Sequence, residues 1–114
     1  MPAKVAHFTQ VEEQVFEDPS ARGVKVRWLI KKEDGAENFA MRLFEIEPQG
    51  YSPHHTHDWE HEIYVLEGKG VIRIGDVEHE VEPGCFAFIP PREPHSIINT
   101  GDKPLKFLCL IPYK

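Results

Sequence analysis

The sequence predicts an all-β domain, built as a sandwich or a barrel. Short runs of β-branched and aromatic residues recur along the chain, and Gly, Pro, Asp or Asn separate them. Helical periodicity is weak throughout, and ten prolines suit strand ends and corners better than helices. At 114 residues, 40% of them hydrophobic, the chain has the length of one domain with a single modest core.

Eight runs are expected to be strands. In chain order they are "VKVRWLIKK" (24–32), "NFAMRLFEIE" (38–47), "EIYVLEG" (62–68), "GVIRIG" (70–75), "VEHEVE" (77–82), "CFAFIP" (85–90), "HSIIN" (95–99) and "LKFLCLIPY" (105–113). A hairpin turn is predicted at Gly75-Asp76, and a second turn at Glu82-Pro83-Gly84.

The strands belong to a predicted barrel domain spanning 23–114, preceded by an N-terminal segment spanning 1–22. In that segment, "FTQVEEQVFED" is expected to form either a turn of helix or an edge strand.

The charge of the chain excludes two classes of partner. The net charge is −6, with acids spread along the sequence, so nucleic-acid phosphate and an anionic membrane are poor partners. The first residues lack a basic stretch followed by an apolar one, and nowhere do about 18 apolar residues run together. We therefore expect a soluble, cytoplasmic protein that binds a small molecule or another protein.

Both cysteines lie in apolar runs, Cys85 in "CFAFIP" and Cys109 in "FLCLIPY". We expect them to be reduced and to pack as small hydrophobic residues. They lack C-x-x-C spacing, so a zinc site made of cysteines is not expected.

The stretch "SPHHTHDWEHEIYVL" (52–66) holds four of the seven histidines and predicts a metal site. His55 and His57 are two residues apart, so in an extended chain they point the same way. His61 has the parity of the aliphatic residues at 63 and 65 and is expected to point inward. Glu62 lies on the opposite face, which makes His61 the better third ligand.

A fourth ligand is expected far along the chain, in "GCFAFIPPREPHSIIN", where His95 shares a face with Ile97. Four inward imidazoles without an ion would leave several buried ring nitrogens in need of partners. His55, His57, His61 and His95 are therefore predicted to bind one divalent ion. The remaining histidines are expected at the surface: His7, His54 and His79.

These residues resemble the two sequence motifs of the cupin superfamily. The first motif, G-x5-H-x-H-x3,4-E-x6-G, is matched with one residue fewer after its first glycine by Gly50, His55, His57, His61 and Gly68. His61 stands in the glutamate position; with the longer spacing Glu62 fills it, but the next glycine is displaced by one. The second motif, G-x5-P-x-G-x2-H-x3-N, is matched by Gly84, Pro90, His95 and Asn99, and Arg92 replaces its middle glycine.

The chain is similar to small single-domain cupins of the cupin_2 type that carry a four-histidine metal site. The resemblance implies a jelly-roll-like barrel, the cupin double-stranded β-helix, with the ion inside its mouth. It also implies a homodimer, in which residues 1–22 are the segment expected to pair or swap. Pairing would cover sheet edges that a short domain leaves open.

Four imidazoles suit Mn, Fe, Co, Ni, Cu or Zn, so the identity of the metal stays open. Three functions remain: an oxygen-using, dioxygenase-like enzyme acting on a small organic molecule, a non-redox metal-dependent isomerase or decarboxylase, and a ligand-binding or sensing protein without turnover. No general base, and hence no catalytic residue, is identified.

The expected cavity lining, with core packing as the alternative, is Phe39, Met41, Phe107 and Cys109. Trp59 is expected to shield the site, and Arg92 to clamp a carboxylate or lie in solvent.

Overall fold

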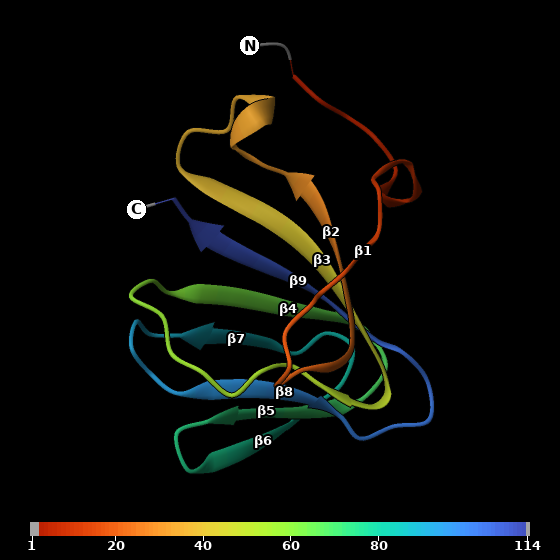
Figure 1. Ribbon diagram of the computed structural model, residues 1–114, viewed down its shortest axis with the longest axis vertical. Coiled ribbons are helices and arrows are strands. Elements are labelled where there is room, and N and C mark those ends of the chain that lie inside the picture. Colours follow the sequence, from red (N-terminus) through yellow and green to blue (C-terminus); the bar gives the residue numbers. More distant parts are fainter. Residues whose placement is uncertain (1–2, 114) are drawn as a thin grey trace.

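A computed structural model describes residues 3–113 as a single antiparallel sheet that rolls into a nearly closed barrel (Figure 1). This architecture confirms the predicted all-β barrel. Residues 1, 2 and 114, which belong to the predicted N-terminal segment and to the end of the predicted barrel domain, lie outside the described residues.

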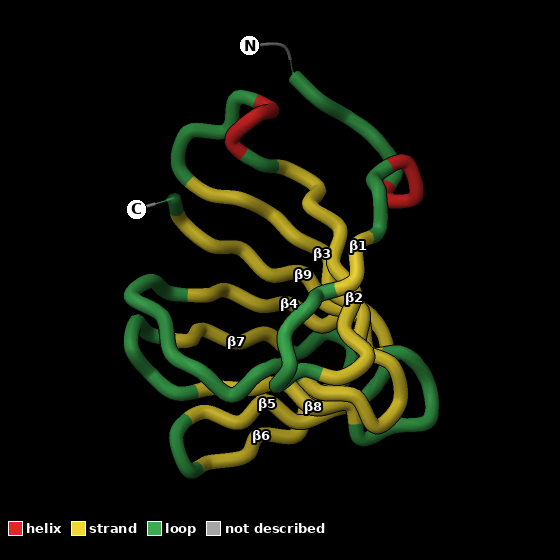
Figure 2. The backbone as a smooth tube through the Cα atoms, viewed as in Figure 1, coloured by secondary structure: helices red, strands yellow, loops and turns green. Residues whose placement is uncertain are grey.

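The described chain contains nine strands and two short 3-10 helices (Figure 2). The strands are β1 (Gln14–Val15), β2 (Arg22–Ile30), β3 (Phe39–Tyr51), β4 (His61–Glu67), β5 (Gly70–Ile74), β6 (Val77–Val81), β7 (Phe86–Ile89), β8 (His95–Asn99) and β9 (Leu105–Pro112). The helices are η1 (Phe8–Gln10) and η2 (Lys32–Asp34). All eight predicted strands are present, and β3 continues four residues beyond its predicted end at 47.

The N-terminal segment contains both of the elements that its sequence allows, η1 and the two-residue strand β1. Gln14 of β1 pairs with Val26 of β2, and the backbone N–H of Phe16 donates to the carbonyl of Val24 at 2.9 Å. The segment is thereby attached along the edge of β2.

The long strand β3 organises the barrel. Up to Ile46 it pairs with β2 on one side and β9 on the other, and at its end Tyr51 pairs with Arg22 of β2 and with Ile98 of β8. The main strand order is β6-β5-β8-β3-β9-β4-β7, with β2 pairing only with β1 and β3. The segment that follows β3 therefore runs beside β8, where an isolated bridge joins His55 to His95.

Both predicted turns are present. Gly75 has a φ of 59° in the two-residue link between β5 and β6, a backbone conformation that suits glycine in a tight hairpin. At the second turn the N–H of Cys85 donates to the carbonyl of Glu82 at 3.0 Å. Gly84 has a φ of 96°, as the third residue of a type II turn requires after a proline.

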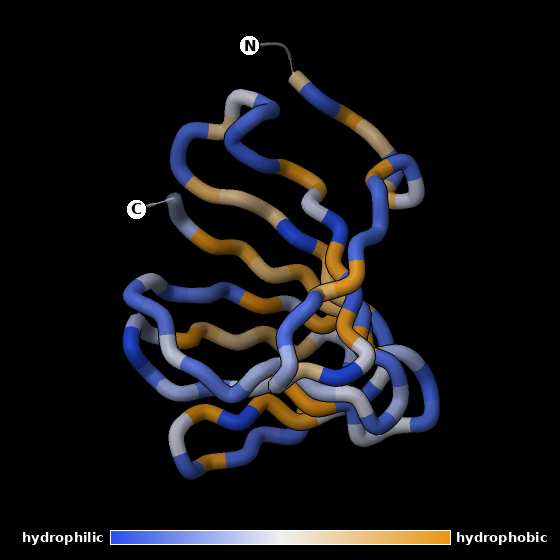
Figure 3. Tube along the Cα trace, viewed as in Figure 1, coloured by the Kyte–Doolittle hydropathy of each residue, from blue (hydrophilic) through white to orange (hydrophobic). Residues whose placement is uncertain are grey.

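The core lies between the two sides of the rolled sheet. Figure 3 shows hydrophobic residues concentrated on strands and hydrophilic ones along most of the links between them. The buried cluster is formed by Val24, Val26, Phe44, Ile46, Ile63, Val65, Ile72, Ile89, Ile97, Leu105, Phe107 and Cys109. In residues 3–113 no helix has the length and apolar character needed to cross a membrane.

The outer face of β4 and β7 carries exposed aromatic side chains, with Tyr64 47%, Phe86 80% and Phe88 54% exposed.

The homodimer and the cytoplasmic location stay predictions, since a single chain tests neither.

Candidate metal centre

The four histidines of the predicted site come from three parts of the chain that the barrel brings together. His55 and His57 lie in the link between β3 and β4, His61 begins β4, and His95 begins β8. Backbone hydrogen bonds hold the link in place: the N–H of His55 donates to the carbonyl of His95 at 3.1 Å, and the reverse bond is 3.0 Å. The N–H of Arg92 donates to the carbonyl of His57.

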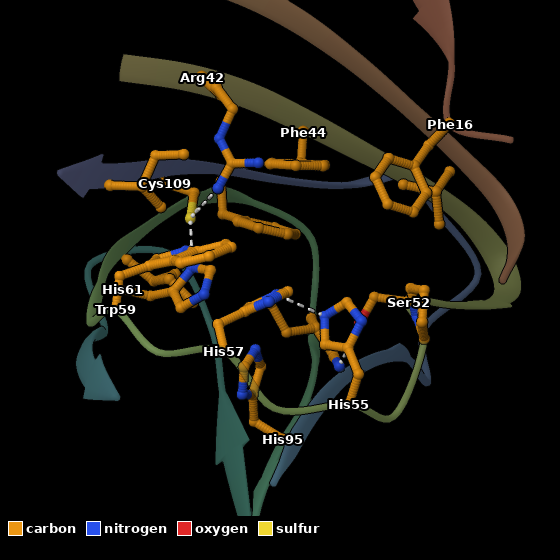
Figure 4. Close-up of a pocket in the computed structure, with 16 residues that line it drawn as sticks. Phe16, Arg42, Phe44, Ser52, His55, His57, Trp59, His61, His95 and Cys109 are labelled. Atoms are coloured by element: carbon orange, nitrogen blue, oxygen red, sulfur yellow. Dashed lines mark hydrogen bonds between the residues drawn. The ribbon is translucent and has the colours of Figure 1, made fainter. Parts of the chain in front are cut away.

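Three of the four imidazoles converge closely enough to share one ion. His55, His57 and His95 each offer a ring nitrogen, and these nitrogens all lie within 4.8 Å of one another. The Nε2 atoms of His55 and His57 are 3.0 Å apart, which also permits a hydrogen bond between them (Figure 4). Two nitrogens about 2.1 Å from one ion and at right angles to each other are also separated by about 3.0 Å, so the pair fits neighbouring ligand positions.

His61 lies beside this cluster, with its ring centroid 4.9 Å from that of His95 and 5.1 Å from that of His57. Its side chain is buried, and its Nε2 has no hydrogen-bond partner among the described residues. An orphaned buried nitrogen is costly unless an ion or another ligand contacts it. The inward orientation of His61 agrees with the prediction. His61 is not part of the close group of His55, His57 and His95, so the four-histidine site stays a prediction.

The other nitrogen of two of these rings is held by a neighbouring group. Nδ1 of His95 lies 2.9 Å from the carbonyl of Glu93, and Nδ1 of His61 lies 3.4 Å from the sulfur of Cys109. A proton on Nδ1 satisfies both contacts and leaves Nε2 as the free electron-pair donor, an arrangement typical of metal-binding histidines.

Burial keeps the imidazoles neutral. It lowers the pKa of His57 from its usual 6.5 to about 4, and nearby positive charge on His55, His95 and Arg42 adds to this effect. Burial likewise lowers the pKa of His61 to about 3 and, with His95, lowers that of His55. The neutral ring is the form that binds a metal ion, so these three are ready to do so at neutral pH.

The alternation predicted for this region is confirmed. Glu62 is exposed on the face of β4 opposite to His61, and His7, His54 and His79 are exposed as predicted. Alternation thus separates His61 from the exposed Glu62, and His55 and His57 from the exposed His54.

The histidines open into a cavity of about 150 Å³ inside the barrel. Its wall is formed by Phe16, Val24, Arg42, Phe44, Ser52, Pro53, His55, His57, Trp59, His61, Ile63, His95, Ile97, Phe107, Cys109 and Ile111. Among residues 3–113, none of those that form this wall carries a carboxylate. Trp59 stacks on His57 with ring centroids 4.4 Å apart and shields one side of the cluster, as predicted.

The predicted lining is half correct. Phe107 and Cys109 line the cavity, whereas Phe39 is 54% exposed and Met41 is absent from the wall. Both misplaced residues lie on the face of β3 that points away from the cavity, because the residues that alternate with them point inward. Arg92 is exposed and outside the wall, so of the two roles expected for it, the solvated arginine agrees with the structure and the carboxylate clamp in this cavity does not.

Arg42 is the charged residue of the cavity wall, and it is not among the cavity residues expected from the sequence. It shares its face of β3 with Ala40, Phe44 and Ile46, all of which are buried. A charged residue at an inward-facing position of an otherwise apolar strand was the signal available in the sequence.

The chain is similar in sequence and in structure to known proteins. The family described as "Cupin domain" matches residues 42–111, more than half of the chain. Among solved structures, the polyketide cyclase RemF from Streptomyces resistomycificus is 38% identical with a TM-score of 0.93, covering 99% of this chain and 81% of that one. An oxalate-binding protein of Thermotoga maritima is 35% identical over 92 residues, 77% of this chain and 74% of that protein.

The chain spans less than half the length of the first curated relatives that it matches. One is a glucose-6-phosphate isomerase of Thermococcus litoralis, 43% identical over 54 residues, which are 43% of this chain and 28% of that protein.

Proposed function

The chain belongs to the cupin domain family, and from this premise we propose that it is a metal-dependent enzyme acting on a small organic molecule inside the barrel. His55, His57, His61 and His95 would hold one divalent transition-metal ion. The observation that carries the proposal is the convergence of three imidazoles in a cavity whose wall, among residues 3–113, has no carboxylate. The metal is one of Mn, Fe, Co, Ni, Cu or Zn, all of which imidazole suits.

We propose a non-redox reaction of an enolisable carbonyl compound, of the cyclase, isomerase or decarboxylase type. A bound ion would supply a Lewis acid that polarises a carbonyl oxygen. The chain's own contribution is to orient the substrate and to exclude water, through flat aromatic walls that include Phe44, Trp59 and Phe107. The full-length likeness to a polyketide cyclase supports this class.

The oxygen-using, dioxygenase-like reaction is the second candidate. The donor set favours it, because neutral nitrogen ligands also suit iron, copper and manganese and leave coordination positions open. The two candidates differ in two observables: the dioxygenase consumes dioxygen and needs a redox-active metal, whereas the non-redox enzyme needs neither.

The test is turnover of a panel of 1,3-diketones, β-keto acids and phenols by protein loaded with Zn²⁺ or with Fe²⁺, with and without oxygen. We expect turnover with Zn²⁺ under anaerobic conditions, and its loss in the double variant His57→Ala, His95→Ala. Oxygen uptake that requires Fe²⁺ would establish the dioxygenase instead. Binding of panel compounds without turnover by either form would identify a ligand-binding protein and overturn the enzymatic proposal.

A further inference from the structure

Arg42 brings a fixed positive charge into the cavity wall. Its cross-strand neighbours are Trp28 on β2 and Cys109 on β9. The guanidinium carbon lies 5.3 Å from the ring centroid of Trp28 and 4.8 Å from that of Phe44, and Nη2 donates to the sulfur of Cys109 at 3.2 Å. Figure 4 shows the guanidinium directed toward Cys109, on the side of the cavity where His61 lies.

None of these contacts neutralises the charge. Among residues 3–113, the ion pairs within 4.0 Å do not include Arg42, and the cavity wall has no aspartate or glutamate. Its Nε is buried without a hydrogen-bond partner. A partly buried guanidinium that meets only aromatic rings and a thiol is poorly compensated, and an anion beside it would relieve that cost.

The position of this charge relative to the histidines is set by Cys109. The same sulfur lies 3.2 Å from Nη2 of Arg42 and 3.4 Å from Nδ1 of His61, so the guanidinium and the imidazole cluster share one side of the cavity. The protein carries 19 acidic residues and a net charge of −6, yet the charge in this wall is positive. The local field therefore favours an anion although the protein as a whole repels one.

We propose that Arg42 is the anion-recognition residue of this cavity, and that its ligand is a small molecule with one anionic oxygen group, held between the guanidinium and the histidine cluster, on a flat apolar body. Binding of this ligand beside a metal ion rests on the proposed function, whereas binding to Arg42 in the metal-free protein does not. A cavity of about 150 Å³ has the size of one that binds benzene, so it accommodates a single ring or the end of a larger molecule. The rings of Phe16, Phe44 and Phe107 provide the apolar surface against which such a body packs.

A purely structural role is the competing explanation, because cation–π contacts with Trp28 and Phe44 also stabilise the sheet. The two roles predict different results. A structural arginine changes the melting temperature and leaves ligand preference unchanged, whereas an anion-binding arginine changes the preference for charged over neutral ligands of the same shape.

The experiment uses calorimetric titration of the full chain, Zn²⁺-loaded and metal-free, with benzoate against benzamide and with the smaller pair acetate against acetamide. We expect wild type to prefer the anion of at least one pair, and Arg42→Gln to lose that preference by about tenfold or more, the range of a charge-assisted hydrogen bond. Arg42→Lys should restore part of it. Arg22→Gln, which removes an exposed arginine outside the cavity, is the matched control and should bind as wild type.

The outcomes separate this inference from the proposed function. If zinc fails to bind but metal-free wild type prefers the anion through Arg42, the anion site stands and the metal site falls. If zinc binds and Arg42→Gln keeps the full preference, or if wild type binds neither anion, the role assigned to Arg42 is overturned. If Arg42→Gln keeps its zinc content and still unfolds in a cooperative thermal transition, collapse of the site is excluded as the reason for its lost preference for the anion.

Discussion

The sulfur of Cys109 lies 3.4 Å from Nδ1 of His61, so Nδ1 faces the thiol and Nε2 is the ring nitrogen without a hydrogen-bond partner among the described residues. We predict that Cys109→Val, which keeps the volume and removes the acceptor, lowers metal affinity by about tenfold, in the range of lost outer-shell partners. Cys109→Ser should retain most of the affinity. Competition with a chromophoric chelator measures the change, and Cys85→Val is the control. Equal affinity in Cys109→Val and wild type would show that the thiol does not orient His61.

The neighbouring residues His61 and Glu62 provide a matched pair of variants. His61 is buried toward the cavity and Glu62 is exposed on the other face of β4. His61→Ala should lower metal affinity by ~100-fold or more, beyond the range of outer-shell effects, while Glu62→Gln should leave it unchanged. Metal analysis after dialysis against a weak chelator checks both. The reverse pattern would identify Glu62 as the third ligand.

As the pH falls, the metal-free protein should begin to lose stability near pH 6.5, above the pH range in which most carboxylates titrate. The pKa values of His57 and His61 are lowered to about 4 and about 3, below their usual 6.5, so between these limits the unfolded chain binds more protons than the folded one. The free energy of unfolding therefore falls as the pH falls from 6.5 toward 4. Calorimetry should show a smaller dependence in His57→Gln and His61→Gln, but not in His79→Gln. A melting temperature that stays constant over this range would contradict the prediction.

Asn99 should prove structural. Its side-chain amide donates to the carbonyls of Ile46 and Lys103, both at 2.8 Å, and its carbonyl accepts from the N–H of Gly101 at 2.9 Å. Because Asn99→Ala leaves these buried groups unpaired, it should lower the free energy of unfolding by about 3 kcal/mol. Urea unfolding measures the loss, with the exposed Asn38→Ala as control. A loss of metal without a loss of stability would instead assign Asn99 to the site.

Arg92 occupies a backbone conformation that suits glycine. Its φ is 66°, and it stands where the second cupin motif has a glycine. Left-handed backbone costs an L-residue about 1 kcal/mol, so Arg92→Gly should raise the free energy of unfolding by up to that amount. Arg92→Ala keeps the strain and should bring no gain in urea unfolding. Destabilisation by glycine would show that the arginine side chain makes a contact that outweighs the strain.

Strand parity explains why much of the site is predictable from sequence. The orientation of His61 follows from Ile63 and Val65, and that of Glu62 from Tyr64 and Leu66, because successive side chains point to opposite faces. Once one residue of a strand is assigned to the core, the rest follow.

The same rule explains the errors. The apolar side chains of Phe39 and Met41 predict either cavity lining or core packing, but Phe44 and Ile46 place them on the other face of β3. Arg42 was overlooked because a charged residue in a strand is normally exposed. The meeting of His55 with His95 depends on the pairing of distant strand ends, which local alternation does not encode. The inward parity of each histidine predicts that they share the interior, and the family resemblance adds that they share one site.

Phe16 places a side chain from the N-terminal segment in the cavity wall, beside residues from later in the chain. It belongs to the N-terminal segment, lies 6.2 Å ring to ring from Phe44, and lines the same space as the histidines, which come from β3 onward. One part of the cavity wall is therefore encoded in the N-terminal segment, apart from the stretches of sequence that supply the imidazoles. Substitutions at position 16 offer evolution, or an engineer, a way to admit bulkier molecules without disturbing a single imidazole.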